Sequence, residues 1–596
     1  MLRNAASFFL KSKNILWIIA VFWLLVVGNN KPWQQNLVVS DVVSYYGYLP
    51  ATFIFHDIKL EKNEHRVEGV DFPFWPETAP NGGKVIKTTM GLSFLYAPFF
   101  FAGHWLAPFF QAPQDGLSTP YQASLVFGCL LYVLIGFYFL RKLLLLFFSE
   151  GVTSLTMISV FFGTNLLWYT SLNGLMSHGY LFSMLCIFIY LVVKWHRLPQ
   201  LKTAICIGLM GGLITLIRPT MLIAFLIFAL FDVYNKQSLL EKIKLFKTHF
   251  LQLLVMACCT LLMIFPQLLY WKYITGNWLF FSYQGERFYF NHPHLAEGLF
   301  GFRKGWLLYT PIMAFAVLGI FYVKKQARSF FLPVIILFPL IVYILLSWWA
   351  WWYGGGFGLR AFVDFYGLFA LPMACFYKQV IENTTPVFKY AMYVLAALLI
   401  YLNLFQTWQY NKGIIHYDAM TKDAYFSVFM SKNASHLFEH LAEPNYKKAK
   451  AGLPENYSEE EIRAIRPTDK INFKGSNFKI VGYDPASTEV RANFYEMIEP
   501  ETFSISYLGS GNKVTIKAGN GKYVCADRDL QGKLVANRDE AKEWETFELI
   551  YAGENKIVLK AWNQKYVTIH PDDPHGLFAD GDTVSYPQML RIFINE

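Results

Sequence analysis

Long apolar runs recur through most of the chain, and they constrain its fold more than any other feature of the sequence. The first is Ile15–Gly28, and later examples are Ala204–Phe231 and the run that begins at Tyr121. An α-helix needs about 20 apolar residues to cross a bilayer. The chain of 596 residues is 55% hydrophobic and only 16% charged, far less charged than a soluble protein of this length. The sequence therefore predicts a polytopic α-helical membrane protein with about 11 spans.

The net charge of +10 does not indicate a nucleic-acid partner. Lysine and arginine collect at the ends of the apolar runs, where the positive-inside rule expects them. The first 14 residues are typical of a signal-peptide n-region, but no small-residue cleavage site follows Gly28. We therefore expect an uncleaved first span and a cytoplasmic N-terminus. Six of the seven cysteines lie in apolar runs, so no disulfide framework is predicted.

Two segments decide the predicted topology. Pro219 is expected to break Ala204–Phe231 into two short crossings. The run Gly91–Phe110 is interrupted by Pro98 and Gly103, and we expect it to lie on or dip into the outer surface. If this run spans instead, the parity of all later segments changes, or Ala204–Phe231 is a single crossing.

With this topology, unusual ionisable residues gather on the outer face. Basic residues there run against the insertion bias, which suggests that they bind an anionic group such as a lipid phosphate. The alternative for each of them is an ordinary solvated charge in a loop. The residues are Asp41, Lys84, Lys87, His178, Arg218, Glu286, Arg287, Arg303, Lys304 and Arg360.

Asp41 is the carboxylate of the stretch SDVVSYYGYLP, residues 40–50, shortly after the first apolar segment. It is a candidate general base. The alternative is that Ser40 and Asp41 cap a surface helix, which both residue types do well. The tyrosines that follow, Tyr46 among them, are typical of interfacial anchors, although such rings also stack on sugars.

Four cations stand where they could hold a phosphate: Lys87, Arg218 in LIRPT, Lys304 in FRKGWLLYTP, and Arg360 at the end of SWWAWWYGGGFGLR. Each has an alternative as a snorkelling or solvated residue at the end of a span. Asp364 follows Arg360 at the spacing of a helical ion pair. His178, Glu286 and Arg303 are second-tier candidates for contacts with an acceptor. His292 and His294 lack a third ligand at a recognisable spacing, so no metal site is predicted.

Together these motifs resemble the GT-C superfamily of polyprenyl-phosphate-dependent glycosyltransferases, in the branch of protein O-mannosyltransferases and lipid A aminoarabinose transferases. Asp41 matches the acidic residue of the family's first outer loop. Lys87-Thr88-Thr89-Met90 keeps the lysine of a Lys-Pro-Pro-Leu-like element without its prolines. WYGGGFGLR, LIRPT and FRKGWLLYTP are similar to further elements, and the resemblance covers about residues 1–430. Val42 follows Asp41 where the mannosyltransferases have a second acid.

The resemblance implies a GT-C-like fold and transfer of a sugar from a polyprenyl-phosphate donor to an acceptor hydroxyl, with inversion. Asp41 would be the base, and Lys87, Arg218, Lys304 and Arg360 would bind the donor phosphate. His178, Glu286, Tyr46 and Arg303 would contribute at a second tier. Neither a cofactor nor a metal is implied, and the partners would be membrane lipid and a glycan, lipid or protein acceptor. A lipid or glycan transporter without transferase activity is the alternative, and an inactive receptor is a third reading.

The C-terminal part carries an internal repeat. Ile471, Val514 and Ile557 lie 43 residues apart, and Asn477, Asn520 and Asn563 keep the same spacing. Three β-rich units of this length predict a closed threefold assembly. The motifs KAGNGKYV and WETFEL resemble fascin-like β-trefoils, which implies either a spacer or an acceptor-binding module.

The predicted domains are therefore a transmembrane domain over 1–407, an extracytoplasmic helical linker over 408–469 and a β-trefoil over 470–596. The expected location is a bacterial inner membrane, with the C-terminal domain in the periplasm.

Overall fold

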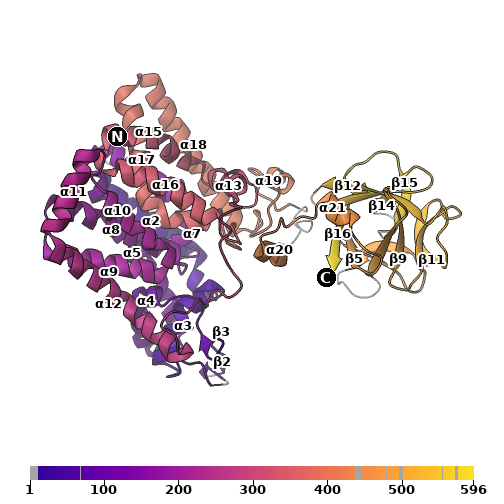
Figure 1. Ribbon diagram of the computed structural model, residues 1–596, viewed down its shortest axis with the longest axis horizontal. Coiled ribbons are helices and arrows are strands. Elements are labelled where there is room, and N and C mark those ends of the chain that lie inside the picture. Colours follow the sequence, from indigo (N-terminus) through magenta and orange to yellow (C-terminus); the bar gives the residue numbers. More distant parts are fainter. Residues whose placement is uncertain are drawn as a thin grey trace. The chain divides into compact units, whose positions relative to one another are not determined.

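The computed structural model describes residues 11–62, 64–67, 69–435, 445–477, 479–494, 501–553, 555–570, 573 and 575–595. The chain divides into two compact units, Met1–Ala434 and Ser435–Glu596. The first unit is built almost entirely of helices, and the second is built mainly of strands (Figure 1).

Within the described residues, six helical segments are long and apolar enough to cross a membrane. Their helices are α2 (Ser12–Asn30), α5 (Thr119–Leu144), α8 (Ser177–Arg197), α12 (Phe250–Thr275), α16 (Phe331–Leu346) and α18 (Pro386–Asn411). The predicted fold class, a helical membrane part followed by an all-β domain, is confirmed. The count of about 11 spans stays a prediction.

Further helices belong to the first unit. They are α6 (Glu150–Phe162), α7 (Leu166–Thr170), α9 (Leu201–Ile217), α10 (Phe225–Leu230), α11 (Lys236–Thr248), α13 (Leu295–Phe300), α14 (Trp306–Tyr309), α15 (Ala314–Gln326), α17 (Tyr366–Asn383) and α19 (Lys422–Val428). Single 3₁₀ turns form η1 (Pro32–Gln34), η4 (Pro311–Met313) and η5 (Arg328–Phe330). Glycines allow close helix crossings, since a Cβ at Gly319 on α15 would overlap the Pro372 carbonyl on α17.

The predicted break at Pro219 is confirmed. Helix α9 ends at Ile217, and the 3₁₀ segment η3 (Pro219–Ala224) begins after Arg218. Arg218 is extended, with φ −146° and ψ 111°, because a residue before proline is disfavoured in the helical region. The break leaves the Arg218 side chain on a short non-helical link between two apolar segments.

The run Gly91–Phe110 forms one helix, α4 (Gly91–Leu106), and a 3₁₀ turn, η2 (Ala107–Phe110). Pro98 lies inside α4 without ending it. A Cβ at Gly103 would stand 2.6 Å from the Tyr121 Cα atom, so α4 packs tightly against α5. A Cβ at Gly91 would overlap the backbone of Ile217, which places the start of α4 against the end of α9 beside Arg218. Whether α4 spans or lies on the membrane stays a prediction.

Helix α3 (Asp41–Phe53) lies in the segment that leads from α2 to α4. Ser40 precedes it with φ 51° and ψ −134°, a conformation rare for a residue with a side chain. Ser40 makes no side-chain hydrogen bond that caps α3, so the alternative in which Ser40 caps this helix is not seen. Two small hairpins follow, β1 (Arg66–Val67) with β2 (Val70–Asp71) and β3 (Glu77–Thr78) with β4 (Lys84–Val85).

The second unit starts with the short helices α20 (Tyr446–Ala451) and α21 (Glu459–Arg463), followed by a sheet of 12 strands among its described residues. A 3₁₀ turn, η9 (Tyr586–Gln588), precedes the last strand. The strands are β5 (Lys470–Lys474), β6 (Ile480–Tyr483), β7 (Val490–Phe494), β8 (Phe503–Tyr507), β9 (Lys513–Ala518), β10 (Tyr523–Asp527), β11 (Lys533–Arg538), β12 (Thr546–Gly553), β13 (Lys556–Lys560), β14 (Tyr566–Ile569), β15 (Leu577–Gly581) and β16 (Leu590–Asn595).

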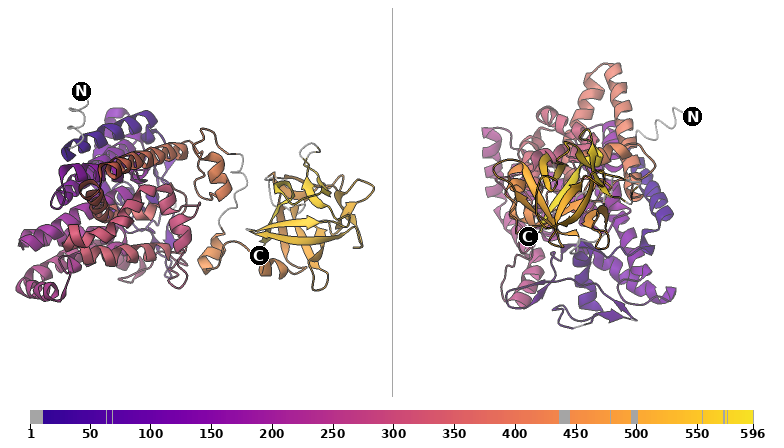
Figure 2. Two further views of the ribbon diagram at one scale, coloured as in Figure 1. Left: turned by 90° about the horizontal axis from the view of Figure 1, so that it is seen from above. Right: turned by 90° about the vertical axis from the view of Figure 1, so that its right-hand side faces the viewer.

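Six of these strands close into a ring. The antiparallel pairs run β5–β8, β8–β9, β9–β12, β12–β13, β13–β16 and back from β16 to β5. The hairpins β6–β7, β10–β11 and β14–β15 add one pair to each third of the ring. Figures 1 and 2 show these strands curving round a common interior. The sequence prediction of a closed all-β domain is confirmed, while the fascin-like assignment stays a prediction.

The repeat of 43 residues is visible in the contacts. Ile471, Val514 and Ile557 are all fully buried in the barrel core. The side-chain amides of Asn477, Asn520 and Asn563 donate to the carbonyls of Ala492, Ala536 and Ala579 at 2.6, 2.9 and 2.7 Å. Each asparagine oxygen accepts from the backbone N–H two residues later. The repeated asparagine therefore ties each hairpin to its own third of the barrel.

Replacing Asn563 with alanine should loosen the β13–β14 turn, because two hydrogen bonds are lost and the Ala579 carbonyl loses its partner. We expect the opening free energy of this hairpin to fall by about 1–3 kcal/mol. Hydrogen exchange of the amides of 556–569 in the full-length protein measures it. Lys565→Ala is the control, since that side chain forms an ion pair with Asp582 at the surface, where such pairs contribute little. Equal exchange in the two variants would contradict the prediction.

Candidate functional site

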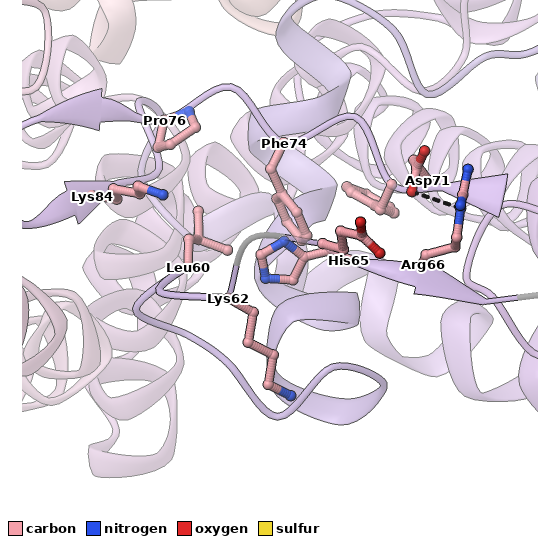
Figure 3. A pocket seen from close by; sticks show the side chains of 10 residues that line it. Leu60, Lys62, His65, Arg66, Asp71, Phe74, Pro76 and Lys84 are labelled. Atoms are coloured by element: carbon pink, nitrogen blue, oxygen red, sulfur yellow. Dashed lines mark ion pairs between the residues drawn. The ribbon is translucent and has the colours of Figure 1, made fainter. Parts of the chain in front are cut away.

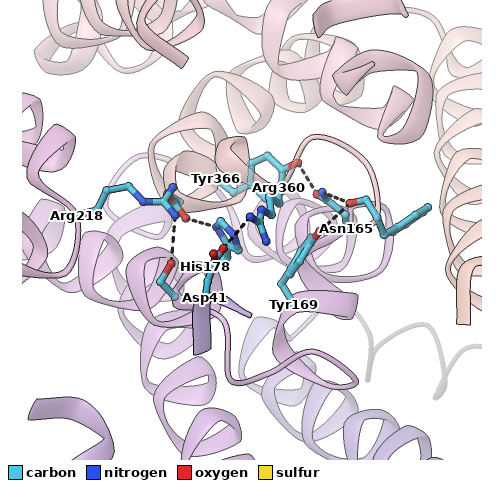
Figure 4. Close-up of polar contacts among 10 residues, drawn as sticks. Asp41, Asn165, Tyr169, His178, Arg218, Arg360 and Tyr366 are labelled. Atoms are coloured by element: carbon cyan, nitrogen blue, oxygen red, sulfur yellow. Dashed lines mark hydrogen bonds and ion pairs between the residues drawn. The ribbon is translucent and has the colours of Figure 1, made fainter. Parts of the chain in front are cut away.

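An ion pair joins the start of α3 to the end of the glycine-rich stretch, residues 347–360. The Arg360 Nη2 atom donates to the Asp41 Oδ2 atom at 2.8 Å (Figure 4). Arg360 opens the 3₁₀ helix η6 (Arg360–Phe365), which leads into α17. The Asp41 side chain keeps 39% of its surface exposed and the Arg360 side chain 17%. The contact is therefore accessible from outside, and residues 319 positions apart in the chain meet in it.

A second ionic cluster lies beside it and is centred on Asp364. The Asp364 side chain is fully buried. Arg218 donates from Nη1 to its Oδ2 atom, and the Nδ1 atom of His178 lies 2.8 Å from its Oδ1 atom. Arg218 also donates from Nη2 to the Ser177 hydroxyl at 3.2 Å. The break after α9, the start of α8 and the helix η6 thus contribute one residue or more each to this cluster.

The ion pair expected from the spacing of Arg360 and Asp364 is wrong. Arg360 pairs with Asp41, and Asp364 pairs with Arg218 and His178. The reason is that residues 360–365 form a 3₁₀ helix. With about three residues per turn, positions four apart no longer share a face. The two side chains therefore serve two different partners.

A small group of buried polar side chains binds the backbone of the glycine-rich stretch. The Phe357 carbonyl accepts from Asn165 Nδ2 at 3.0 Å and from the Tyr169 hydroxyl at 3.3 Å. The Tyr366 hydroxyl donates to Asn165 Oδ1 at 2.8 Å. Gly358 has φ 58°, a conformation that favours glycine. A Cβ at Gly356 would overlap the Tyr169 hydroxyl. The backbone that presents Arg360 is consequently fixed by its neighbours.

Lys87 and Glu286 form a third group next to the first two. The Lys87 Nζ atom donates to Glu286 Oε1 at 2.6 Å and lies 3.5 Å from Glu77. Burial lowers the pKa of Lys87, but its hydrogen bond to Glu286 and the two carboxylate charges more than offset this, so the pKa is raised. Trp349 donates to the other Glu286 oxygen at 2.9 Å. Tyr283 connects this group to the site, because Lys87 lies 5.3 Å from its ring centre and Asp41 and Arg218 act electrostatically on its hydroxyl.

Lys304 lies inside the protein rather than at the accessible face. Its side chain is almost completely buried, and it donates to the Tyr417 carbonyl at 2.5 Å and to the Gly356 carbonyl. Burial lowers the pKa of Lys304 from its usual 10.5 to about 7. It thus ties the glycine-rich stretch to the segment that follows α18. Its predicted contact with a donor phosphate stays a prediction.

Arg303 and Tyr46 make their contacts with residues outside the groups described above. The Arg303 guanidinium lies 3.6 Å from the centre of the Trp352 ring and donates from Nε to the Asp418 carbonyl at 3.2 Å. The Tyr46 hydroxyl donates to the Gly116 carbonyl at 2.7 Å, and its ring packs on Tyr96. The structure therefore brings together Asp41, Arg218, Arg360 and His178, with Lys87 and Glu286 adjoining. It places Tyr46 outside this group.

Sequence reasoning missed the central role of Asp364. A signal was present, because an aspartate inside the apolar run AFVDFYGLF is costly unless it is paired. Ser177 and Tyr283 carried no comparable signal. Among the described residues, no three His, Cys, Asp or Glu side chains gather as a metal site needs. The expectation of no metal stays a prediction.

A cavity of about 320 Å³ lies between the two small hairpins (Figure 3). It is lined by Leu60, Lys62, Glu64, His65, Arg66, Asp71, Phe72, Phe74, Pro76 and Lys84. Arg66 pairs with Asp71 at 3.1 Å, and His65 pairs with Asp57 at 3.0 Å. The lining includes Lys84, one of the basic residues expected on the outer face, but neither Asp41 nor any of the four cations predicted to hold the donor phosphate.

No family model and no curated protein matches the sequence. Solved structures do match. An apo oligosaccharyltransferase from Archaeoglobus fulgidus is 14% identical over 75% of this chain and 60% of its own, with a TM-score of 0.38. The Pmt1-Pmt2 protein O-mannosyltransferase complex of S. cerevisiae, bound to the sugar donor, is 10% identical over 98% of this chain and 63% of its own, with a TM-score of 0.23. This chain thus spans less than two thirds of either.

A third solved structure matches a shorter part of the chain. A designed threefold-symmetric protein, ThreeFoil, is 13% identical over 21% of this chain and 99% of its own, with a TM-score of 0.20.

Gly356→Ala should destabilise the first unit by about 1–3 kcal/mol, because the new methyl group overlaps the Tyr169 hydroxyl. Adding Tyr169→Phe removes that oxygen and should restore most of the loss, so the two effects will not add. The thermal unfolding midpoint of the purified protein in detergent measures both. Gly28→Ala is the control, since a Cβ there has no atom within 4 Å. Additive effects of the two substitutions would show that the overlap is not the cause.

Lys304 gives a dependence of stability on pH. Because its pKa is lowered to about 7 in the folded chain, the unfolded chain holds a proton between about pH 7 and 10 that the folded chain lacks. Stability should therefore rise with pH in this window, by at most about 1.4 kcal/mol per unit. Lys304→Met should remove this rise. Unfolding midpoints of the two proteins from about pH 6 to 9 test it, and parallel curves would contradict it.

Proposed function

We propose that the protein is a membrane glycosyltransferase that moves a sugar from a polyprenyl-phosphate donor to an acceptor hydroxyl at the extracytoplasmic face. One observation carries this proposal. The accessible carboxylate of Asp41 stands 2.8 Å from Arg360, next to the cluster that contains Arg218. Such a transfer needs a group that accepts a proton and cationic groups that bind a phosphate. The site offers one carboxylate for the first role and two guanidinium groups for the second.

The arginines suit the donor phosphate. A guanidinium group offers two parallel N–H donors that match phosphate oxygens and keeps its charge at every physiological pH. The Arg218 and Arg360 side chains keep 19% and 17% of their surface exposed, so each can still meet a ligand. They would neutralise the charge that develops on the leaving phosphate. Lys87 adjoins this place, and Lys304 supports the backbone behind it.

Asp41 suits the role of base. Its carboxylate would accept the proton of the acceptor hydroxyl while the hydroxyl oxygen attacks the anomeric carbon. The bond between that carbon and the phosphate oxygen breaks, and the polyprenyl phosphate leaves with the electron pair. Direct displacement inverts the anomeric centre and uses only groups of this chain and its two substrates. Holding both substrates together supplies much of the rate.

The second candidate is a lipid or glycan transporter without transferase activity. Transporters place ionisable residues at breaks within apolar helices. Arg218 stands at such a break, between α9 and η3, with the buried Asp364 as its partner. This candidate assigns no chemistry to Asp41, and that difference separates the two.

We further infer that the enzyme lies in a bacterial inner membrane as a multi-pass protein, with a cytoplasmic N-terminus and its barrel in the periplasm. The acceptor would be a glycan, a lipid or a protein. The barrel would serve as a spacer or as a module that holds this acceptor. Support for the outer placement comes from the other lysines and arginines, which collect at the opposite ends of the apolar runs, where the positive-inside rule expects the cytoplasm.

Asp41→Asn should reduce sugar transfer by about 10²- to 10⁴-fold, the usual contribution of a general base, while polyprenyl phosphate still binds. Mass analysis of polyprenyl-phosphate sugars and surface glycans, in cells with and without the protein, measures transfer. Asp423→Asn is the matched control, because Asp423 also lies in the first turn of a helix of the same unit and is exposed. Unchanged transfer in Asp41→Asn would remove Asp41 from the mechanism. Lipid translocation without transfer would favour the transporter.

A further inference from the structure

The two arginines of the site are held in unlike ways. Arg218 is bound to Asp364, which is fully buried and also holds His178 on its other oxygen. Arg360 is bound to Asp41, which keeps 39% of its side chain exposed. One carboxylate is thus enclosed and serves two partners, while the other faces outward.

This difference decides which contact a ligand can replace. Breaking a buried ion pair leaves an uncompensated charge inside the protein and is strongly unfavourable. A partly exposed ion pair such as Asp41–Arg360 costs less to break, because water can solvate the released carboxylate. An incoming anion can therefore displace Asp41 from Arg360 far more readily than it can displace Asp364 from Arg218.

The backbone before Asp41 agrees with a movable carboxylate. Ser40 has φ 51° and ψ −134°, a sparsely populated conformation for a residue with a side chain. Such strained residues gather at ligand sites and switch regions. By contrast, Asp364 lies within η6, between buried neighbours on both sides.

We propose that Asp364 is a positioning residue that fixes Arg218 and His178 as the permanent half of an anion site, whereas Arg360 exchanges Asp41 for the donor phosphate. This inference rests on the proposed function. Binding of the phosphate would then release the Asp41 carboxylate beside the reacting groups. The donor would bind before Asp41 is free to take a proton from the acceptor.

Two isosteric substitutions separate this inference from a simple charge effect. Asp41→Asn and Asp364→Asn each remove one negative charge next to an arginine. If charge alone mattered, both would tighten the binding of an anion. If Asp364 positions Arg218, Asp364→Asn weakens binding by about tenfold. Asp41→Asn removes a competitor for Arg360 and tightens binding by about two- to fivefold.

The measurement is the affinity of the full-length protein in detergent for farnesyl phosphate, a short polyprenyl phosphate that carries no sugar to transfer. Asp423→Asn again serves as the charge-matched control. Opposite shifts for the two test variants support the inference. Unchanged or tighter binding in Asp364→Asn overturns the positioning role, and unchanged or weaker binding in Asp41→Asn overturns the exchange.

A milder variant covers the case in which Asp364→Asn does not fold, as judged by its unfolding midpoint. Ser177→Ala removes a second side-chain hydrogen bond of Arg218 and fits the same buried space. It should weaken binding of farnesyl phosphate, and unchanged affinity overturns the positioning role. In an Arg218→Gln background, Asp364→Asn and Ser177→Ala should have no further effect on affinity, whereas an undiminished effect there contradicts action through Arg218.

The same experiment keeps the two proposals apart. If the wild-type protein does not bind farnesyl phosphate, the proposed function fails, and this inference fails with it. If the wild type binds and Asp364→Asn binds equally well, only the positioning role fails. A raised KM for the donor with a smaller change in kcat is the expected kinetic signature of Asp364→Asn.

Discussion

The buried carboxylate of Asp364 is the interaction on which the architecture of the site depends. A charge enclosed in an apolar helical unit is tolerated only when it is paired and hydrogen-bonded. Asp364 meets this condition through Arg218 and His178, which come from the break after α9 and from the start of α8. Three segments far apart in the chain must therefore meet at one point before any of them is satisfied. The geometry of the accessible face follows from that requirement.

The glycine-rich stretch plays the complementary part. Asn165 and Tyr169 donate hydrogen bonds to its Phe357 carbonyl, and the buried Lys304 donates to its Gly356 carbonyl. These contacts fix the irregular backbone that leads to Arg360, at the start of η6, and so place Arg360 beside Asp41. Loops that carry function are commonly positioned by a rigid scaffold in this way. Here the scaffold is the set of helices that surround Asp364.

Much of this organisation could be predicted from residue patterns. The apolar runs indicated the helical part, Pro219 indicated the break that exposes Arg218, and the spacing of 43 residues indicated the closed barrel. Asp41, Arg218 and Arg360 stood out because charge is rare near such runs. The pairing of these residues could not be predicted, because a helical spacing rule was applied to a segment that folds as a 3₁₀ helix. The burial of Lys304 depends on Tyr417, more than 100 residues away, and no local pattern reports such a contact.

The way in which the barrel closes bears on how the chain is made. The ring is complete only when β16 pairs with β5, and these strands stand at opposite ends of the barrel sequence. Synthesis proceeds from the N-terminus at about 5–20 residues per second, so β5 waits several seconds for its partner after it leaves the ribosome. During that interval β5 presents an unpaired edge, which exposes it to pairing with another chain. A chaperone that shields this edge would therefore act chiefly between the synthesis of the first strand of the barrel and that of its last.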